Sequence, residues 1–340
     1  MEKFGARDYY RTRPHSQVGS RLSLTDVPVK SPMIPANETF DGTFPFEPHF
    51  TTAPGFRMHY VDEGSGPPIV CLHGEPTWSY LYRKFIPPLA KDFRVIAPDH
   101  MGFGKSETPQ DREYTLSTHV GNLSALIAEL DLKDITLVLQ DWGGPIGGAY
   151  TLRNPERVRR LVLMNTILGY SAAVTDAPRD PTHKPPRLVS SNWFRWVKRS
   201  VDDGSFYEQM SQLGSHIGDL MGRLGMRGAK TETWLRAYAA HFRTPADCKG
   251  AIEFPLDIIQ DRMVPYVLEG FPAVPELRRK PAMLAEGMAD QAIPPELAIA
   301  DFQTLFPAGP VVRLDEVGHF CQEDVPQTLV ALIQLFIQMT

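Results

Sequence analysis

The sequence is poor in cysteine and lacks long apolar runs, and these absences exclude several classes of protein. Only 3 cysteines occur among the 340 residues, Cys71, Cys248 and Cys321. An odd, sparse set with no close pair argues against a disulfide framework and for a reducing compartment. No apolar run is long enough to span a bilayer, and residues 1–8 contain no apolar signal segment. We therefore expect a cytoplasmic protein that does not enter a membrane.

Basic charge and metal-binding patterns are also missing. The formal net charge of -5 gives no reason to expect nucleic acid or an anionic membrane as a partner. The 10 histidines form no His-x-x-x-His pair, and no cysteines cluster at ligand spacing, so we expect no metal. The stretch 102–106, Gly-Phe-Gly-Lys-Ser, ends like a phosphate-binding loop. That motif requires glycine where this chain has Asp99, which argues against a nucleotide site.

The sequence does contain an alternation of strand-like and helix-like segments. Apolar or alternating runs predict strands at 56–61, 68–72, 93–97, 135–139, 161–164, 282–285 and 311–314. Apolar residues at helical spacing predict helices from Leu116 to Leu130 and from Val325 to Phe336. Strands that alternate with helices are typical of a mostly parallel sheet flanked by helices, an α/β fold.

The segment 168–276 differs from this pattern, because it contains no buried strand run and is rich in proline, glycine and tryptophan. We interpret it as a mostly helical cap inserted into a core domain made of residues 45–167 and 277–340. A chain of 340 residues is long for a single core, which agrees with such an insertion. Residues 1–44 are polar and without sustained periodicity, and we expect them to form an extension that wraps around the core or dangles from it.

The apolar run from Ile135 to Gln140 ends on Asp141, and Trp142, Gly143 and Gly144 follow directly. An unbroken apolar run bounded by glycine predicts a buried parallel strand, and ligands bind at the carboxyl ends of such strands. The order of strand, sharp turn and helix matches the nucleophile elbow of the α/β-hydrolases, with Asp in the place where most members have Ser. We therefore predict the α/β-hydrolase fold.

Three residues that follow predicted strands form a candidate triad. Asp141, Asp290 and His319 occur in the order nucleophile, acid and histidine, which is the chain order of the α/β-hydrolase triad. Each residue alone has another interpretation. Asp141 could cap a helix, Asp290 could cap the helix that begins near Pro294 and Pro295, and His319 could be a hydrogen-bonded core histidine. Their combination at strand ends favours the catalytic interpretation.

An aspartate in place of serine changes the reaction that the site can perform. A serine hydroxyl that attacked saturated carbon would leave an ether, which water does not readily cleave. A carboxylate leaves an ester, whose electrophilic carbonyl belongs to the enzyme. Water activated by His319 can hydrolyse that ester while Asp290 holds the imidazole and stabilises the imidazolium. Asp141 therefore predicts hydrolytic displacement at saturated carbon, with alkyl halides or epoxides as substrates.

The leaving group decides between these two substrate classes. The backbone N–H groups of Glu75 and Trp142 stand where this fold places oxyanion donors. A departing halide needs further donors in a dry pocket, and the indole N–H of Trp142 can supply one. An epoxide oxygen instead needs an acid, usually a tyrosine hydroxyl. The predicted cap contains four tyrosines that keep this alternative open, Tyr170, Tyr207, Tyr238 and Tyr266.

Three motifs resemble the haloalkane dehalogenases. Residues 73–84, His-Gly-Glu-Pro-Thr-Trp-Ser-Tyr-Leu-Tyr-Arg-Lys, resemble the family's oxyanion block in the version with Glu75 after His-Gly. Residues 140–144 resemble its nucleophile and first halide-binding Trp, and residues 318–323 resemble its base segment. Some members have the catalytic acid in the position of Asn165, which is not acidic, so the resemblance assigns that role to Asp290.

Members with this glutamate take their second halide donor from a cap tryptophan. The resemblance therefore implies that Trp196, or Trp193 one turn earlier, binds the halide, although either residue could instead anchor the packing of the cap. The predicted function is cofactor-free hydrolysis of a halogenated aliphatic compound, by a monomer or small homo-oligomer whose partners are this substrate and water. The alternatives are an epoxide hydrolase that uses the same triad with cap tyrosines, and a non-catalytic binder or light-emitting oxygenase on the same scaffold.

Overall fold

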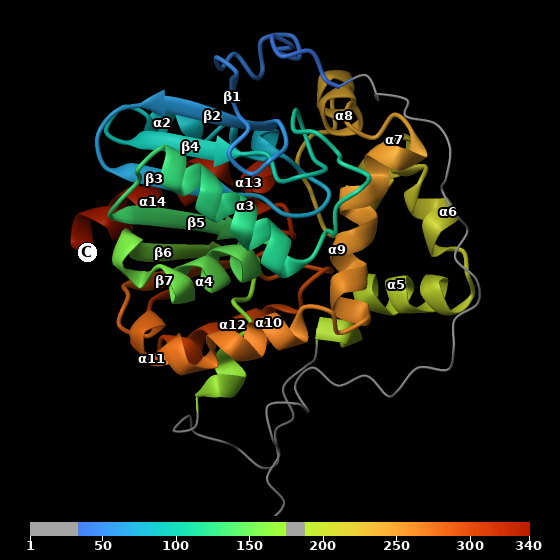
Figure 1. Ribbon diagram of the computed structural model, residues 1–340. Coiled ribbons are helices and arrows are strands. Elements are labelled where there is room, and N and C mark those ends of the chain that lie inside the picture. The colour runs from blue at the N-terminus through green and yellow to red at the C-terminus, as the bar shows by residue number, and fades with distance from the viewer. Residues whose placement is uncertain (1–32, 175–187) are drawn as a thin grey trace, which may run out of the picture.

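An eight-stranded sheet forms the centre of the computed structural model, which describes residues 33–174 and 188–340 (Figure 1). Its strands lie in the order β1-β2-β4-β3-β5-β6-β7-β8. The pairs β1–β2 and β2–β4 are antiparallel, and every other neighbouring pair is parallel. The strands are β1 His49–Thr51, β2 Met58–Gly64, β3 Pro68–Leu72, β4 Arg94–Pro98, β5 Ile135–Gln140, β6 Val158–Met164, β7 Ala282–Gly287 and β8 Val311–Leu314.

Helices cover both faces of this sheet. Helices α3 and α4 contact each other on one face, and α2 and α14 contact each other on the opposite face (Figure 1). Every residue of β5 and of β7 is buried, as expected for parallel strands that are covered on both faces. The helices of the core are α2 Ile86–Leu89, α3 Leu116–Glu129, α4 Gly143–Arg153, α12 Pro295–Leu305, α13 Cys321–Asp324 and α14 Pro326–Met339.

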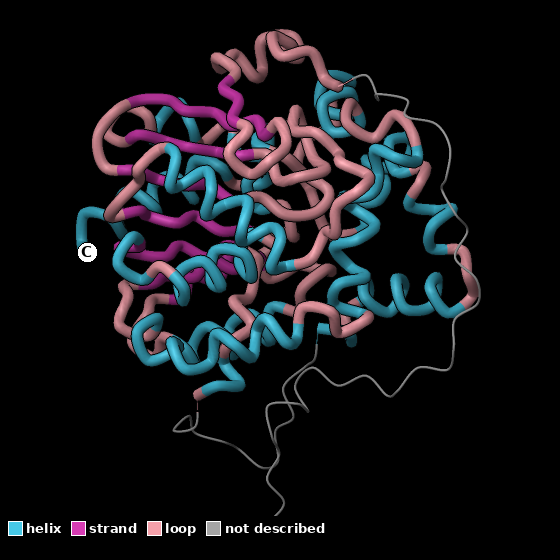
Figure 2. Tube along the Cα trace, viewed as in Figure 1, coloured by secondary structure: helices cyan, strands magenta, loops and turns pink. Residues whose placement is uncertain are grey.

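The described residues between β6 and β7 form helices and no strand (Figure 2). They are α5 Asn192–Asp202, α6 Phe206–Met210, α7 Leu213–Arg223, α8 Glu232–Ala239, α9 Lys249–Ile259, α10 Val264–Gly270 and α11 Val274–Leu277. Helix α9 contacts α5 and α6, and α7 contacts α8. Helices α10 and α11 instead contact α4, so this last part of the predicted cap segment flanks the sheet (Figure 1). We keep the name cap for helices α5–α9, and the domain boundaries remain predictions.

The α/β-hydrolase fold predicted from the sequence is confirmed by this architecture. The strands expected at 68–72 and 311–314 occur with these bounds, and most others differ by a few residues at one end. Strand β1 was not expected, because three residues are too few to show an alternating pattern. Within the segment expected to be helical, α8 begins after Thr231, which caps its first turn by accepting a hydrogen bond from the N–H of Trp234.

The end of the polar extension packs against the core. Ile34, Phe40 and Phe44 are buried, although the extension as a whole is polar. The ring of Phe44 lies 4.9 Å and that of Phe40 5.7 Å from the ring of Trp78, which lies within the predicted oxyanion block. Residues 33–44 therefore wrap around the core domain. The remainder of the predicted extension lies outside the described residues.

The loop that imitates a phosphate-binding motif has a structural role. The ammonium group of Lys105 donates hydrogen bonds to the carbonyl oxygens of Ala36 at 2.7 Å and Glu38 at 3.0 Å. The carboxylate of Asp99 accepts from the backbone N–H of Lys105 at 2.8 Å. The lysine therefore fastens the extension to the core.

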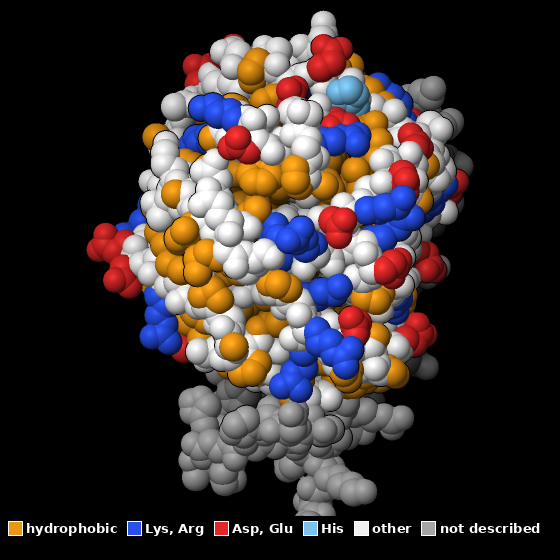
Figure 3. Space-filling model, turned by 90° about the vertical axis from the view of Figure 1, so that its left-hand side faces the viewer, with side chains coloured by type: hydrophobic (Ala, Val, Ile, Leu, Met, Phe, Trp, Pro, Cys, Tyr) orange, Lys and Arg blue, Asp and Glu red, His pale blue; other side chains and the backbone are white. Residues whose placement is uncertain are grey.

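The face at the amino ends of the parallel strands lies away from the cap. On it, apolar side chains are interspersed with charged side chains of both signs (Figure 3). Two large apolar side chains of α14 are well exposed, Leu335 and Met339. Within the described ranges, no helix combines the length and the apolar character needed to cross a bilayer.

Candidate active site

Asp141 stands at the turn between β5 and α4. Its φ of 49° lies in the left-handed region, which side-chain-bearing residues rarely adopt. The sharp turn brings the start of α4 so close to β3 that a Cβ atom on Gly143 would collide with the carbonyl oxygen of Leu72. Asp141 does not cap α4, whose N-cap is Trp142 without a side-chain cap. The turn therefore presents the Asp141 carboxylate at the carboxyl end of the sheet.

Both carboxylate oxygens of Asp141 have partners. Oδ1 accepts a hydrogen bond from the backbone N–H of Glu75 at 2.7 Å, and Oδ2 lies 3.4 Å from Nε2 of His319. The other ring nitrogen of His319, Nδ1, lies 2.8 Å from Oδ2 of Asp290. The three residues that the sequence places after separate strands therefore meet in one chain of contacts.

Asp290 uses its two oxygens for different purposes. Oδ1 accepts from the backbone N–H groups of Ala292 at 2.7 Å and Ile293 at 3.0 Å, which fixes the turn after β7. Oδ2 faces His319 and also accepts from Nδ2 of Asn165 at 2.9 Å. Asp290 therefore does not cap α12, whose N-cap is Pro294 without a side-chain hydrogen bond, and its catalytic role remains a prediction.

Asn165 and Gln140 are neighbours of the triad that the sequence motifs did not single out. Asn165 follows β6 and orients Asp290, as described above. Nδ2 of Asn165 also donates to the carbonyl of Gly287, and Nε2 of Gln140 donates to the carbonyl of His319 at 3.2 Å. The only available signal was position, because both residues stand at the carboxyl ends of strands.

Trp142 lies under the cap. Its ring stacks on that of Phe254 from α9, with centroids 4.4 Å apart and an interplanar angle of 11°. Trp142 is 4% exposed, and its indole N–H has no hydrogen-bond partner among the described residues. An indole N–H without a protein partner beside Asp141 suits a ligand that accepts hydrogen bonds.

Trp193 and Trp196 lie in α5 and stack on each other with centroids 5.0 Å apart. Trp196 also contacts Phe206, with centroids 6.0 Å apart. Among the described residues, the rings of this pair make no contact with the ring of Trp142, whose face is covered by Phe254. These contacts do not show whether Trp193 or Trp196 is the second halide donor. The role of a cap tryptophan therefore remains a prediction.

Comparisons with known proteins agree with this geometry. A family model described as the α/β hydrolase fold matches residues 67–326. The chain belongs to the α/β-hydrolase family. Haloalkane dehalogenase 2 of Mycobacterium tuberculosis is 33% identical over 295 residues, which cover 85% of this chain and 94% of that protein. A solved haloalkane dehalogenase from Paraglaciecola agarilytica, described as tetrameric, has a TM-score of 0.67 and 31% identity over 85% of this chain and 92% of its own.

Another relative of this α/β-hydrolase has a different name. A protein of Shewanella oneidensis, a cis-3-alkyl-4-alkyloxetan-2-one decarboxylase, is 30% identical over 311 residues, which cover 88% of this chain and 91% of that protein. The chain is therefore an α/β-hydrolase enzyme with haloalkane dehalogenases among its relatives, and one further relative is named for a decarboxylation.

The electrostatics of the hydrolase site raise the pKa of His319. Burial disfavours the imidazolium, but the charge of Asp290 and the hydrogen bonds with Asp141 and Asp290 outweigh burial and raise the pKa to about 10. The imidazole is therefore protonated at neutral pH. A change that removes the charge of Asp141 lowers this pKa again.

Two further carboxyl groups are buried next to the triad. The side chains of Glu75 and Glu286 are buried, and burial raises the pKa of each well above its usual value, with the charges of Asp141 and Asp290 respectively adding to the effect. The backbone N–H of Glu75 contacts Asp141, and its role as an oxyanion donor remains a prediction, whereas the sequence motifs did not single out Glu286.

The four tyrosines considered for an epoxide hydrolase make contacts that do not involve Asp141. Tyr238 donates to Oε1 of Glu323 at 2.7 Å, and the ring of Tyr266 lies 3.6 Å from the guanidinium carbon of Arg153. Tyr207 is 57% exposed. A Cβ atom on Gly270 would touch both the ring of Tyr170 and the side chain of Leu152, which lies near the end of α4. Tyr170 therefore lies at that end of the helix, whereas Asp141 precedes its start.

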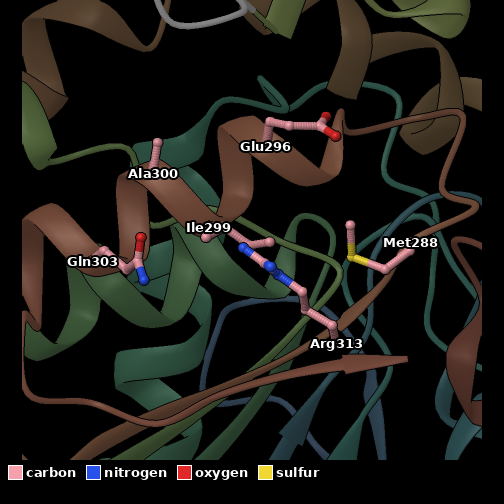
Figure 4. Close-up of a pocket in the computed structure, with 6 residues that line it drawn as sticks. All are labelled: Met288, Glu296, Ile299, Ala300, Gln303 and Arg313. Atoms are coloured by element: carbon pink, nitrogen blue, oxygen red, sulfur yellow. The ribbon is translucent and has the colours of Figure 1, made fainter. Parts of the chain in front are cut away.

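A separate hollow lies on the surface between α12 and the edge strand β8 (Figure 4). It contains neither the triad nor any other predicted site residue. Its lining residues are Met288, Glu296, Ile299, Ala300, Gln303 and Arg313. Among the described residues, no three His, Cys, Asp or Glu side chains converge to hold a metal ion.

Proposed function

We propose that the protein hydrolyses a halogenated aliphatic compound to an alcohol, a halide ion and a proton. The observation that carries this proposal is the aspartate at the nucleophile elbow. Its Oδ1 is held by the N–H of Glu75, and its Oδ2 faces His319. The similarity to haloalkane dehalogenases over most of the chain supports it. The substrate and water are its partners, and no cofactor takes part.

In the first step, Oδ2 of Asp141 attacks the carbon that carries the halogen. A C–O bond forms, the carbon–halogen bond breaks, and the halide departs with the bonding electrons. The free indole N–H of Trp142 is available to bind the halide, and Trp196 or Trp193 of the cap is the second donor. Hydrogen bonds to a charged group contribute about 1.5–3 kcal/mol each.

In the second step, water attacks the carboxyl carbon of the Asp141 ester. Esterification removes the charge of Asp141, so the pKa of His319 falls and its imidazole can accept the proton of the attacking water. The charge of Asp290 stabilises the imidazolium. The oxyanion develops on Oδ1, which the N–H of Glu75 already contacts, and the N–H of Trp142 is the second donor. Release of the alcohol restores the carboxylate.

The cellular setting follows from the same features. The three cysteines are free and buried, which agrees with a reducing compartment, and we propose that the reaction takes place in the cytoplasm. We expect a monomer or a small homo-oligomer, because a tetramer is described for one relative.

Incubation with a short bromoalkane tests this function. The wild-type protein should release acid and bromide. His319→Gln should still alkylate Asp141 but should not hydrolyse the ester, so mass spectrometry should find the alkyl group on a peptide that contains Asp141. Asp141→Asn is the matched control and should acquire no alkyl group. Failure of the wild type to release bromide, together with failure of His319→Gln to form an adduct with any haloalkane, would overturn the proposal.

Decarboxylation of a β-lactone is a second candidate, and the relative from Shewanella oneidensis favours it. Asp141 could attack the saturated ring carbon that bears the ring oxygen, which opens the ring and leaves a carboxylate on the neighbouring carbon. Loss of carbon dioxide would then form the double bond and expel Asp141. This route consumes no water.

The products distinguish the two reactions. A cis-3,4-dialkyl-oxetan-2-one should give an alkene and carbon dioxide if the second candidate is correct, and gas chromatography detects both. A bromoalkane should give an alcohol and bromide if the first is correct. Alkene from the lactone without bromide from any haloalkane would replace the first candidate by the second.

A further inference from the structure

A cap loop of residues 224–228, between α7 and α8, contacts the two loops that carry the base and the acid. The carbonyl oxygen of Leu224 accepts hydrogen bonds from the backbone N–H of His319 at 3.3 Å and from that of Gln291 at 3.5 Å. His319 is the base, and Gln291 directly follows Asp290. One carbonyl group of the cap therefore links the loop that carries His319 to the loop that carries Asp290.

The carboxylate of Asp324 also binds the cap loop 224–228. Its Oδ1 accepts from the N–H groups of Arg227 and Gly228, each at 2.8 Å, and its Oδ2 accepts from the N–H of Gly318 at 3.0 Å. Gly318 directly precedes His319. Because one rigid carboxylate binds both segments, the position of the cap loop and that of the base loop are coupled.

Gly225 lets the two backbones approach closely. Its φ is +99°, and a Cβ atom there would lie 2.6 Å from the carbonyl oxygen of Ala289 and 3.3 Å from the Cα atom of Gly318. Ala289 and Gly318 directly precede Asp290 and His319. A side chain at position 225 would therefore push on the backbone next to both catalytic residues.

We propose that the cap loop 224–228, fastened by Asp324, positions His319 for the hydrolytic step. The inference rests on the proposed function, because it concerns the second half of that reaction. Alkylation requires the Asp141 carboxylate, which is held from the core by Glu75. Hydrolysis requires His319 to direct a water molecule at the ester carbon, so it is the step that is sensitive to the position of the base loop.

The comparison of Gly225→Ala with Gly204→Ala tests the proposal. Both glycines lie in the cap with positive φ, but a Cβ atom on Gly204 has no neighbour within 4 Å. Both variants therefore suffer backbone strain, and only Gly225→Ala presses on the catalytic loops. Under single-turnover conditions with a bromoalkane, bromide release should stay within about twofold of wild type in both. Hydrolysis of the alkyl-enzyme should slow by about 10- to 100-fold in Gly225→Ala alone.

A second pair of variants keeps the test valid if Gly225→Ala fails to fold. Asp324→Asn replaces one acceptor oxygen by an amide NH₂ group that cannot accept from the backbone N–H it faces. The variant therefore loses the hydrogen bonds either to the cap loop or to Gly318. The control Glu316→Gln removes a negative charge from the loop between β8 and α13, which carries His319. The Glu316 carboxylate is exposed and lies 3.9 Å from the guanidinium of Arg227. Asp324→Asn should accumulate alkyl-enzyme at steady state, detected by mass spectrometry after rapid quenching, and Glu316→Gln should not.

Equal slowing of both steps in Gly225→Ala and Asp324→Asn, or unchanged hydrolysis in both, would overturn the positioning role. A merely structural contribution would lower the melting temperature without separating the two steps. Failure of the proposed function itself has another signature, because the wild type would then neither release bromide nor become alkylated.

Discussion

The sheet edge and the cap contribute to the candidate site in different ways. At the sheet edge, hydrogen bonds fix each reacting group: Asp141 is held by the backbone of Glu75, and His319 by Asp290. In the cap, the aromatic residues are held by ring packing, such as that of Trp193 on Trp196. Directional bonds fix the position of an atom more narrowly than ring contacts do. We therefore expect the residues of the sheet edge to determine which reaction takes place, and the residues of the cap to determine which substrates fit.

The cap loop 224–228 is the exception to this division. It lies in the cap, but it is held by hydrogen bonds to the base loop in the same way as the residues of the sheet edge. The distinction that matters is therefore the kind of contact and not the domain to which a residue belongs. Variants of the triad and of the tryptophans test this distinction.

The largest effect should come from the acid of the sheet edge. Asp290→Asn removes the charge that stabilises the imidazolium, and we expect kcat to fall by about 10²- to 10⁴-fold. Adding Asn165→Asp should recover at least about tenfold of this loss, because Nδ2 of Asn165 lies 2.9 Å from the oxygen of Asp290 that faces His319. Steady-state bromide release measures both. A double variant no faster than Asp290→Asn would show that the position of Asn165 cannot carry the acid.

A smaller effect should come from the halide donors. Trp142→Phe keeps the stack on Phe254 and removes one N–H, which should slow bromide release by about 1.5–3 kcal/mol, roughly 10- to 150-fold. Either Trp196→Phe or Trp193→Phe should show a similar loss, and the other should stay near wild type. If neither matters, the cap supplies no indole donor, and the second donor lies elsewhere.

The smallest change should be a shift in titration. The pKa of His319 is raised from 6.5 to about 10, so protonation of His319 stabilises the fold below pH 6.5, and this contribution is lost as the pH rises towards about 10. The difference in the free energy of unfolding between wild type and His319→Gln should therefore decrease over this range. In Asp141→Asn, NMR titration of the imidazole should give a lower pKa, whereas Trp196→Phe should leave it unchanged. An unchanged pKa in Asp141→Asn would show that the two groups are not coupled.

The sequence predicted those residues whose position follows from chain topology. Asp141 directly follows β5, and Asp290 and His319 lie in the loops after β7 and β8. The carboxyl ends of such parallel strands meet at one edge regardless of how side chains pack. The backbone donor of Glu75 was predictable for the same reason.

Other features depend on packing between distant segments, which no local pattern records. Asn165 contacts Asp290 only because neighbouring strands bring their ends together, and Phe254 covers Trp142 because of the way α9 lies on the core. The burial of Phe40 and Phe44 was missed because their neighbours in sequence are polar, which concealed two anchoring rings.

The left-handed backbone of Asp141 has an evolutionary consequence. A φ of 49° costs a side-chain-bearing residue energy that glycine would not incur, of the order of 1 kcal/mol. Selection for stability alone would therefore favour glycine at this position, and under the proposed function the carboxylate is kept by selection for turnover. In a lineage that no longer needed the reaction, Asp141 would be among the first residues free to change, while the sheet around it would remain.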